Sequence, residues 1–162
     1  MWSDGGMSHH VEVSRTVAAS PEKVYEMVSD LPRMGEWSPE NTGGKWVKGA
    51  SGPAVGAVFQ GTNQLGRKKW KTVSKVTAAD VGREFAFDVT AAGMKVAGWG
   101  FTISPAADLV GGSTVTHWWD DHRNPVIAKI TGLALGVKDR AAHNRSNMEH
   151  MLERLAATIT AS

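Results

Sequence analysis

Hydrophobic and polar residues alternate one by one over residues 10–17, near the start of the chain. This alternation predicts a β-strand with one buried face. Ser20 and Pro21 follow, a favoured N-cap and a favoured first helical residue. Four apolar residues then continue at helical spacing: Val24, Met27, Val28 and Leu31. The pattern predicts a strand, a first helix that ends at Pro32, and one further short helical turn.

The middle of the chain, as far as about His122, consists of short alternating runs separated by glycine-rich turns. Short runs at even spacing are typical of an antiparallel meander. Alternate residues of each run share one face of such a sheet, and we expect that face to point inward. The glycines on either side of Trp99 are expected to let the sheet bend. The inward-facing set comprises Phe59, Asn63, Trp70, Thr72, Phe85, Phe87, Trp99, Phe101, Val115, His117 and Trp119.

The last part of the chain, residues 125–159, has apolar residues at helical spacing. A continuous helix of this length would extend on the order of 50 Å, which exceeds the width of a domain of this size. We therefore expect a kink or break near Gly132 to Gly136. The predicted apolar stripe consists of Val126, Ile130, Leu133, Val137, Ala141, Met148, Leu152, Leu155 and Ile159.

This order of elements predicts an α+β fold, because the alternation of strands and crossover helices that parallel sheets need is absent. We expect a curved antiparallel sheet of about six to seven strands wrapped around the long C-terminal helix, with two short helices after the first strand. Residues 9–160 are predicted to form one ligand-binding domain and residues 1–8 a disordered tail. A sheet curled around one helix leaves room for an internal cavity.

The composition narrows the classes of function. Cysteine is absent, which excludes disulfides, thiol nucleophiles and cysteine-ligated zinc. The net charge is only +2, and the densest basic cluster, Lys68, Lys69 and Lys71, is interpreted as an exposed strand face, so no nucleic-acid partner is predicted. No run reaches the ~18 apolar residues of a membrane span, and no signal peptide is recognised. We expect a cytoplasmic protein without stable membrane insertion.

Several short motifs, in this order, resemble the START-like superfamily, also called the polyketide cyclase/dehydrase and lipid-transport or SRPBCC group. The resemblance covers roughly residues 11–159 and is greatest to small single-domain actinobacterial members. It implies the helix-grip fold of the birch-pollen allergen and a cavity for lipids, polyketides, sterols or other apolar ligands. The motifs are Ser20–Tyr25, Glu36–Pro39, Val55–Asn63, Trp70, Gly82–Phe87 and Gly112–Thr116.

The polar members of the inward-facing set, Asn63, Thr72 and His117, are the most informative candidates, since a buried polar group needs a partner. His117 is interpreted either as a hydrogen-bonded structural residue or as an acid/base or ligand anchor. Asn144 is expected to contact either the ligand or a sheet residue. The predicted ligand-binding residues are Phe59, Asn63, Trp70, Thr72, Phe85, Phe87, Trp99, Phe101, His117, Trp119, Asn144 and Met148.

Metal and cofactor chemistry is not predicted. Asp120 and Asp121 point to opposite faces of a strand, so Asp120, Asp121 and His122 are interpreted as a polar strand end. His143 and His150 lie seven residues apart, and surface or ion-pair roles with Glu149 and Glu153 are expected for them. Signatures for nucleotide phosphates, dinucleotides and a serine nucleophile are absent from the sequence, and no cofactor is predicted.

Three functions remain open. The first is a carrier or sensor that binds a hydrophobic small molecule of lipid, isoprenoid or polyketide type. The second is a polyketide cyclase or aromatase that holds a flexible chain in a reactive shape, with His117, Asn63 and Trp70 as candidate residues. The third is a protein-interaction module with a filled core. Residues 125–137 could serve as a lid, while the ligand, any reaction and the oligomeric state, monomer or dimer, are left open.

Overall fold

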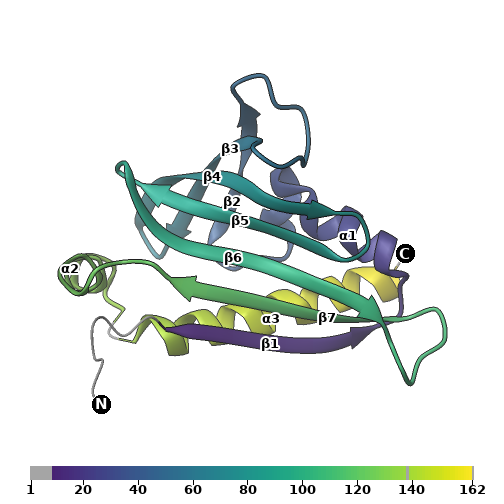
Figure 1. The fold of residues 1–162 in the computed structure, drawn as a ribbon. Helices are drawn as coiled ribbons and strands as arrows, with labels where there is room; N and C mark the ends of the chain where they lie inside the picture. Colours follow the sequence, from purple (N-terminus) through teal and green to yellow (C-terminus); the bar gives the residue numbers. More distant parts are fainter. Residues whose placement is uncertain (1–8, 138, 162) are drawn as a thin grey trace, which may run out of the picture.

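The computed structural model describes residues 9–137 and 139–161; the predicted tail, residues 1–8, lies outside the described residues. The strands form a single antiparallel sheet in the order β1-β7-β6-β5-β4-β3-β2 (Figure 1). The predicted α+β fold, a curved sheet around a long C-terminal helix, is confirmed. The elements are β1 (His10–Val17), α1 (Pro21–Ser29), the 3-10 helix η1 (Leu31–Glu36), β2 (Asn41–Val47), β3 (Val58–Leu65), β4 (Lys68–Asp80), β5 (Glu84–Ala91), β6 (Met94–Pro105), β7 (Ser113–Asp121), α2 (Pro125–Leu135) and α3 (Arg140–Ala161).

The start of α1 follows the predicted cap. The Lys23 backbone N–H donates to the Ser20 side-chain oxygen at 3.2 Å, and Pro21 occupies the first turn. Strand β2 was not individually predicted, because Gly43 and Gly44 interrupt its apolar alternation. A side chain at Gly44 would lie 2.2 Å from the Gln60 carbonyl oxygen and its φ is +150°, so glycine is needed where β2 meets β3.

The strand register places the predicted inward-facing set on one face, which we call the concave face. Trp119 lies opposite Trp99, and Trp99 opposite Phe87. On the same three strands, His117 lies opposite Phe101, and Phe101 lies opposite Phe85. Asn63 lies opposite Trp70, and Thr72 lies opposite Gly61 in the same pair of strands. The alternation along the chain therefore predicted the concave face correctly, although β4 carries an irregularity between Val76 and Ala78.

The glycines beside Trp99 make room for side chains on the opposite, convex face. A side chain at Gly100 would lie 2.3 Å from the ring of Trp118, and one at Gly98 would lie 3.0 Å from the His122 imidazole. The Trp118 ring thus packs closely against the backbone of β6 at Gly100. This close packing accounts for Gly100, and the bend stays a prediction.

The C-terminal helical region breaks where predicted. Helix α2 ends at Leu135, Gly136 adopts the left-handed conformation with φ of 72°, and α3 begins at Arg140. Helix α3 passes beneath the sheet along β1 and β7 (Figure 1). It buries Met148, Leu152 and Leu155, as well as Asn144 and Met151.

The predicted apolar stripe is wrong for the residues of α2. Val126, Ile130 and Leu133 are 66%, 56% and 75% exposed, and no residue of α2 is buried. The break at Gly136 takes α2 off the axis of α3, so no part of the sheet covers its apolar residues. Figure 1 shows α2 (green) beyond the end of β7 rather than under the sheet.

Substitution of Gly100 tests the close packing on the convex face. We expect Gly100→Ala to lower the free energy of unfolding by about 1–3 kcal/mol, because the new methyl group overlaps the Trp118 ring. Gly52→Ala is the control, since a side chain there meets open space. Urea denaturation of both variants measures the effect, and equal stabilities would contradict the proposed packing.

Candidate functional site

The predicted ligand-binding residues differ in their exposure to solvent. Most of the predicted residues are buried: Phe59, Phe85, Phe87, Phe101, His117, Trp119, Asn144 and Met148. Asn63, Trp70, Thr72 and Trp99 face the same way but are only partly buried. These four side chains lie on the same sheet face as the buried core residues and remain partly accessible to solvent. This partly accessible group, which we call the open band, runs over β3, β4 and the middle of β6.

An open pocket of about 570 Å³ lies at the edge of the concave face. Leu65 belongs to the pocket wall and shares the face of Asn63, two residues earlier in β3. The pocket thus lies where the open band reaches the turn between β3 and β4. Its volume is within the range of small-molecule sites. The lining residues are Leu65, Gly66, Leu135, Gly136, Val137, Asp139 and His143.

A polar cluster on α3 adjoins this pocket and centres on Glu40. The Glu40 carboxylate accepts from Asn147 at 2.7 Å and from Arg140 at 3.3 Å. Arg140 also donates to the Asn144 side-chain oxygen at 3.3 Å. The His143 Nε2 atom lies 3.5 Å from Glu40 Oε2, is buried, and has no hydrogen-bond partner among the described residues. The cluster brings an imidazole and a carboxylate together at the pocket wall.

Sequence reasoning missed this cluster in part. Asn144 was a candidate, and its side-chain partner is Arg140 of the same helix rather than a sheet residue; contact with a ligand stays a prediction. His150 pairs with Glu153 at 3.7 Å as predicted, whereas His143 faces Glu40. The sequence signal for the α3 side of this cluster was the spacing of Arg140, Asn144 and Asn147. Residues three, four and seven positions apart share one helix face.

His117 is held in an apolar stack. Its ring lies parallel to that of Phe101, with centroids 4.0 Å apart, and Nδ1 is 2.9 Å from the Gly100 carbonyl oxygen. Because a carbonyl only accepts, Nδ1 carries the proton and Nε2 is left as an acceptor. Burial lowers the pKa of His117 to about 4, and the hydrogen bond to Gly100 opposes this only in part. The imidazole is therefore uncharged near neutral pH.

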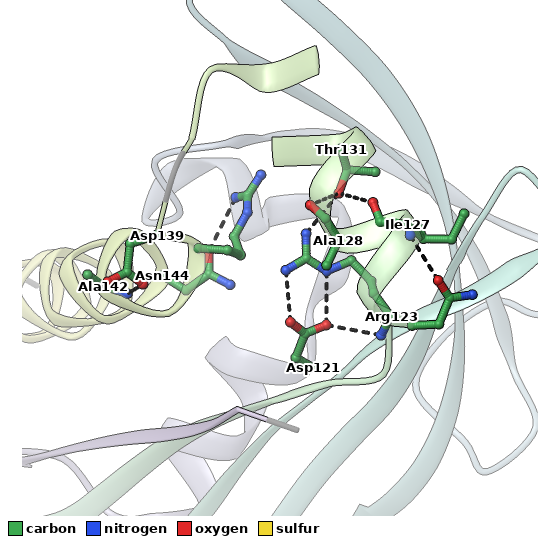
Figure 2. Close-up of polar contacts among 10 residues, drawn as sticks. Asp121, Arg123, Ile127, Ala128, Thr131, Asp139, Ala142 and Asn144 are labelled. Carbon is green, nitrogen blue, oxygen red and sulfur yellow. Dashed lines mark hydrogen bonds and ion pairs between the residues drawn. The ribbon is translucent and has the colours of Figure 1, made fainter. Parts of the chain in front are cut away.

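A buried ion pair fixes α2 to the end of β7 (Figure 2). The Arg123 side chain donates to both carboxylate oxygens of Asp121, at 2.8 and 2.9 Å, and to the Thr131 hydroxyl at 2.9 Å. Burial alone raises the pKa of Asp121, but the hydrogen bonds and charge of Arg123 outweigh it, so this pKa lies below its usual value. The Lys68 ammonium group donates to the Ala134 carbonyl at the other end of α2. Polar contacts thus hold α2 beside the pocket.

These contacts add detail to the polar strand end predicted for Asp120, Asp121 and His122, where β7 ends at Asp121. Asp121 is a buried structural carboxylate, whereas Asp120 pairs with His10. Among residues 9–137 and 139–161, no three His, Cys, Asp or Glu side chains are grouped so that they could hold a metal ion.

The Asp121–Arg123 pair gives a stability test. We expect Arg123→Met to lower the free energy of unfolding by about 3–5 kcal/mol, because Asp121 would remain buried without its partner. Lys95→Met is the control: Lys95 lies 3.2 Å from Asp88 at the surface, and its loss should cost less than about 1 kcal/mol. Similar losses in the two variants, measured by urea denaturation, would show that burial adds nothing to the Asp121–Arg123 pair.

His117 gives a test by pH. The unfolded chain binds a proton at this residue below about pH 6.5, but the folded protein binds it only near the lowered pKa of about 4. Its contribution to stability is therefore complete above pH 6.5 and decreases by about 3 kcal/mol as the pH falls to 4. We expect His117→Phe to remove this part of the pH dependence in urea denaturation, whereas His150→Gln retains it. A pH profile that His117→Phe leaves unchanged would contradict the assignment.

Comparison with known proteins identifies the family. The sequence model of the family described as polyketide cyclase/dehydrase and lipid transport matches residues 8–160. A polyketide-cyclase-like protein of Corynebacterium glutamicum is 31% identical, with 93% of this chain and 83% of that chain covered and a TM-score of 0.52. A START superfamily protein of Mycobacterium smegmatis is 18% identical, with 94% and 98% covered and a TM-score of 0.64. A major latex-like protein of Panax ginseng is 12% identical, with 95% and 99% covered and a TM-score of 0.69.

No curated protein matches the chain. The two neighbours below 25% identity share the fold alone, which is the helix-grip fold that the motifs implied. The predicted resemblance to the START-like superfamily is confirmed by the match over nearly the whole sequence. The chain belongs to the polyketide cyclase/dehydrase and lipid-transport family.

Proposed function

We propose that the protein binds a hydrophobic small molecule between the sheet and α3, as a carrier or sensor. The observation that carries this proposal is the open band of the concave face, where Asn63, Trp70, Thr72 and Trp99 face inward but remain partly accessible. Such a partly accessible band weighs against the alternative of an interaction module with a filled core. Family membership supports hydrophobic ligand binding.

The chemistry of the open band suits a ligand with a long apolar body and few oxygen atoms. Trp70 and Trp99 offer flat apolar surface, with one N–H donor each. The Asn63 side chain donates to the Thr72 oxygen at 3.1 Å. This contact leaves the hydroxyl proton of Thr72 and the carbonyl oxygen of Asn63 for a ligand hydroxyl or carbonyl group. Fatty acids, isoprenoids and polyketide-like compounds have this composition.

The pocket at the β3–β4 turn supplies a route to the open band. Leu65 and Leu135 give this route an apolar wall, and His143 and Asp139 give it a polar side. A ligand that enters beside Leu65 meets the sheet face that carries Asn63 and Trp70. The direction of access follows from the position of Leu65 on the same face as Asn63.

A second candidate function is polyketide cyclase or aromatase chemistry in the same cavity. The observation that favours it is the placement of His143 beside Glu40 at the pocket wall, because a carboxylate orients and stabilises a neighbouring imidazole that takes up a proton. His117 suits this role less well, since its lowered pKa keeps it from donating a proton at neutral pH. In this alternative, His143 takes the role that the sequence had given to His117.

Obstruction of the open band tests ligand binding. We expect Thr72→Phe to weaken uptake of a fluorescent fatty acid by on the order of tenfold or more, because the ring fills space on the concave face. Thr102→Phe is the control, since Thr102 is exposed on the convex face. Fluorescence titration measures uptake, and native mass spectrometry of the purified protein identifies a ligand that co-purifies. Failure of the unmodified protein to bind, or equal binding by both variants, would refute the proposal.

A further inference from the structure

Helix α2 is apolar but buries none of its residues. Its eleven residues carry one charge, Lys129, and seven of them are Val, Ile, Leu or Ala. Val126, Ile130 and Leu133 are spaced by four and three residues, so they share one face of the helix. This face is more than half exposed at each of the three positions. A contiguous exposed apolar face of this kind marks an interaction site.

The polar contacts of α2 explain why this face points outward. The Thr131 hydroxyl accepts from Arg123, and the Ala134 carbonyl accepts from Lys68. Both contacts lie on the side of α2 that faces the rest of the protein. The protein therefore holds α2 in place through its polar groups and leaves Val126, Ile130 and Leu133 to the surroundings.

A cluster of positive charge lies at the turn that contacts the end of α2. Arg67, Lys68, Lys69 and Lys71 are exposed at the β3–β4 turn and the start of β4, and the Lys68 contact joins this turn to α2. With Lys129 they make five cations, and none of them forms an ion pair with a carboxylate of residues 9–137 or 139–161. One carboxylate, Asp139, belongs to the pocket beside them, where it accepts from the Ala142 backbone N–H at 3.0 Å. The positive charge of the turn is therefore not neutralised within the described structure.

We propose that α2 and the β3–β4 turn together dock on the surface of an anionic phospholipid membrane. An apolar helix face enters the boundary between headgroups and acyl chains, while neighbouring lysines and arginines contact lipid phosphates. The complementarity of charge favours this partner, since Lys129 lies on α2 itself and Lys68 joins the basic β3–β4 turn to the helix. No helix among the described residues is long and apolar enough to cross a membrane, and peripheral docking requires none.

Docking would give the pocket a direct connection to lipid. Leu135 is the last residue of α2 and lines the pocket together with Leu65 and Gly66 of the β3–β4 turn. With α2 and this turn on the membrane, the pocket mouth lies at the lipid surface. A hydrophobic ligand then passes between membrane and protein without crossing water. This part of the inference rests on the proposed function; the docking itself does not.

Co-sedimentation with vesicles tests the docking. We expect the protein to bind vesicles of phosphatidylcholine mixed with phosphatidylglycerol, more weakly at high salt, and to bind phosphatidylcholine vesicles poorly. Two double variants, Ile130→Ser with Leu133→Ser and Arg67→Glu with Lys69→Glu, should each weaken binding on the order of tenfold. Val55→Ser with Val110→Ser is the matched control and should bind as the unmodified protein does. Val55 and Val110 are 69% and 104% exposed, in the β2–β3 and β6–β7 loops away from α2 (Figure 1).

Uptake of the fluorescent fatty acid by the same variants in solution separates the two proposals. Variants that lose vesicle binding and retain uptake support the docking and show that the protein still folds. Failure of the unmodified protein to bind anionic vesicles, or a loss in the control equal to that in the α2 variant, overturns the docking. Vesicle binding without any fatty-acid uptake supports the docking and overturns the proposed carriage.

Discussion

The packing of one helix against one face of a seven-stranded sheet is the constraint on which this structure depends. Helix α3 lies along β1 and β7, and its residues Met148, Leu152 and Leu155 are buried there. The helix is too narrow to cover the remaining strands as closely. Side chains of β3, β4 and β6 that face the same way stay partly accessible. The geometry of the fold therefore leaves part of the inward face of the sheet less covered than the part beside α3.

The apolar alternation predicted the concave face residue by residue because a strand has only two faces and the pattern shows which one is buried. Phe85, Phe101 and Trp119 follow directly from it. Strand β2 was not found because its glycines have no side chains to alternate. The position of α2 was also beyond the pattern, since the break at Gly136 was predictable but the direction of the chain after it was not. Val126, Ile130 and Leu133 continue the helical spacing of α3, and nothing in that spacing distinguishes an exposed helix from a buried one.

The polar part of the site was predictable to a smaller extent. His117 and Asn144 were identified by their position among apolar residues, and both are buried. Their partners were not predictable, because Gly100 offers only a backbone carbonyl and Glu40 lies about a hundred residues from Arg140 and Asn147. Hydrogen bonds between distant parts of a chain depend on the tertiary fold, which local spacing does not encode. The pairing of Asp121 with Arg123 is local, but the spacing of two charged residues does not show that both become buried.

In most of the molecule the same residues determine both the stability of the core and the surface that a partner or ligand meets. In the exposed helix α2 these two properties are separate. A change of an inward-facing residue such as Phe101 alters both the core and the site, so stability restricts which residues are acceptable there. Val126, Ile130 and Leu133 of α2 are more than half exposed, and their replacement leaves the core unchanged. Evolution of these three exposed residues is therefore less restricted by folding than that of Thr131, which Arg123 holds. The hydrophobicity of the three residues can diverge between related proteins in step with the surfaces that they meet, while the sheet and α3 remain the same.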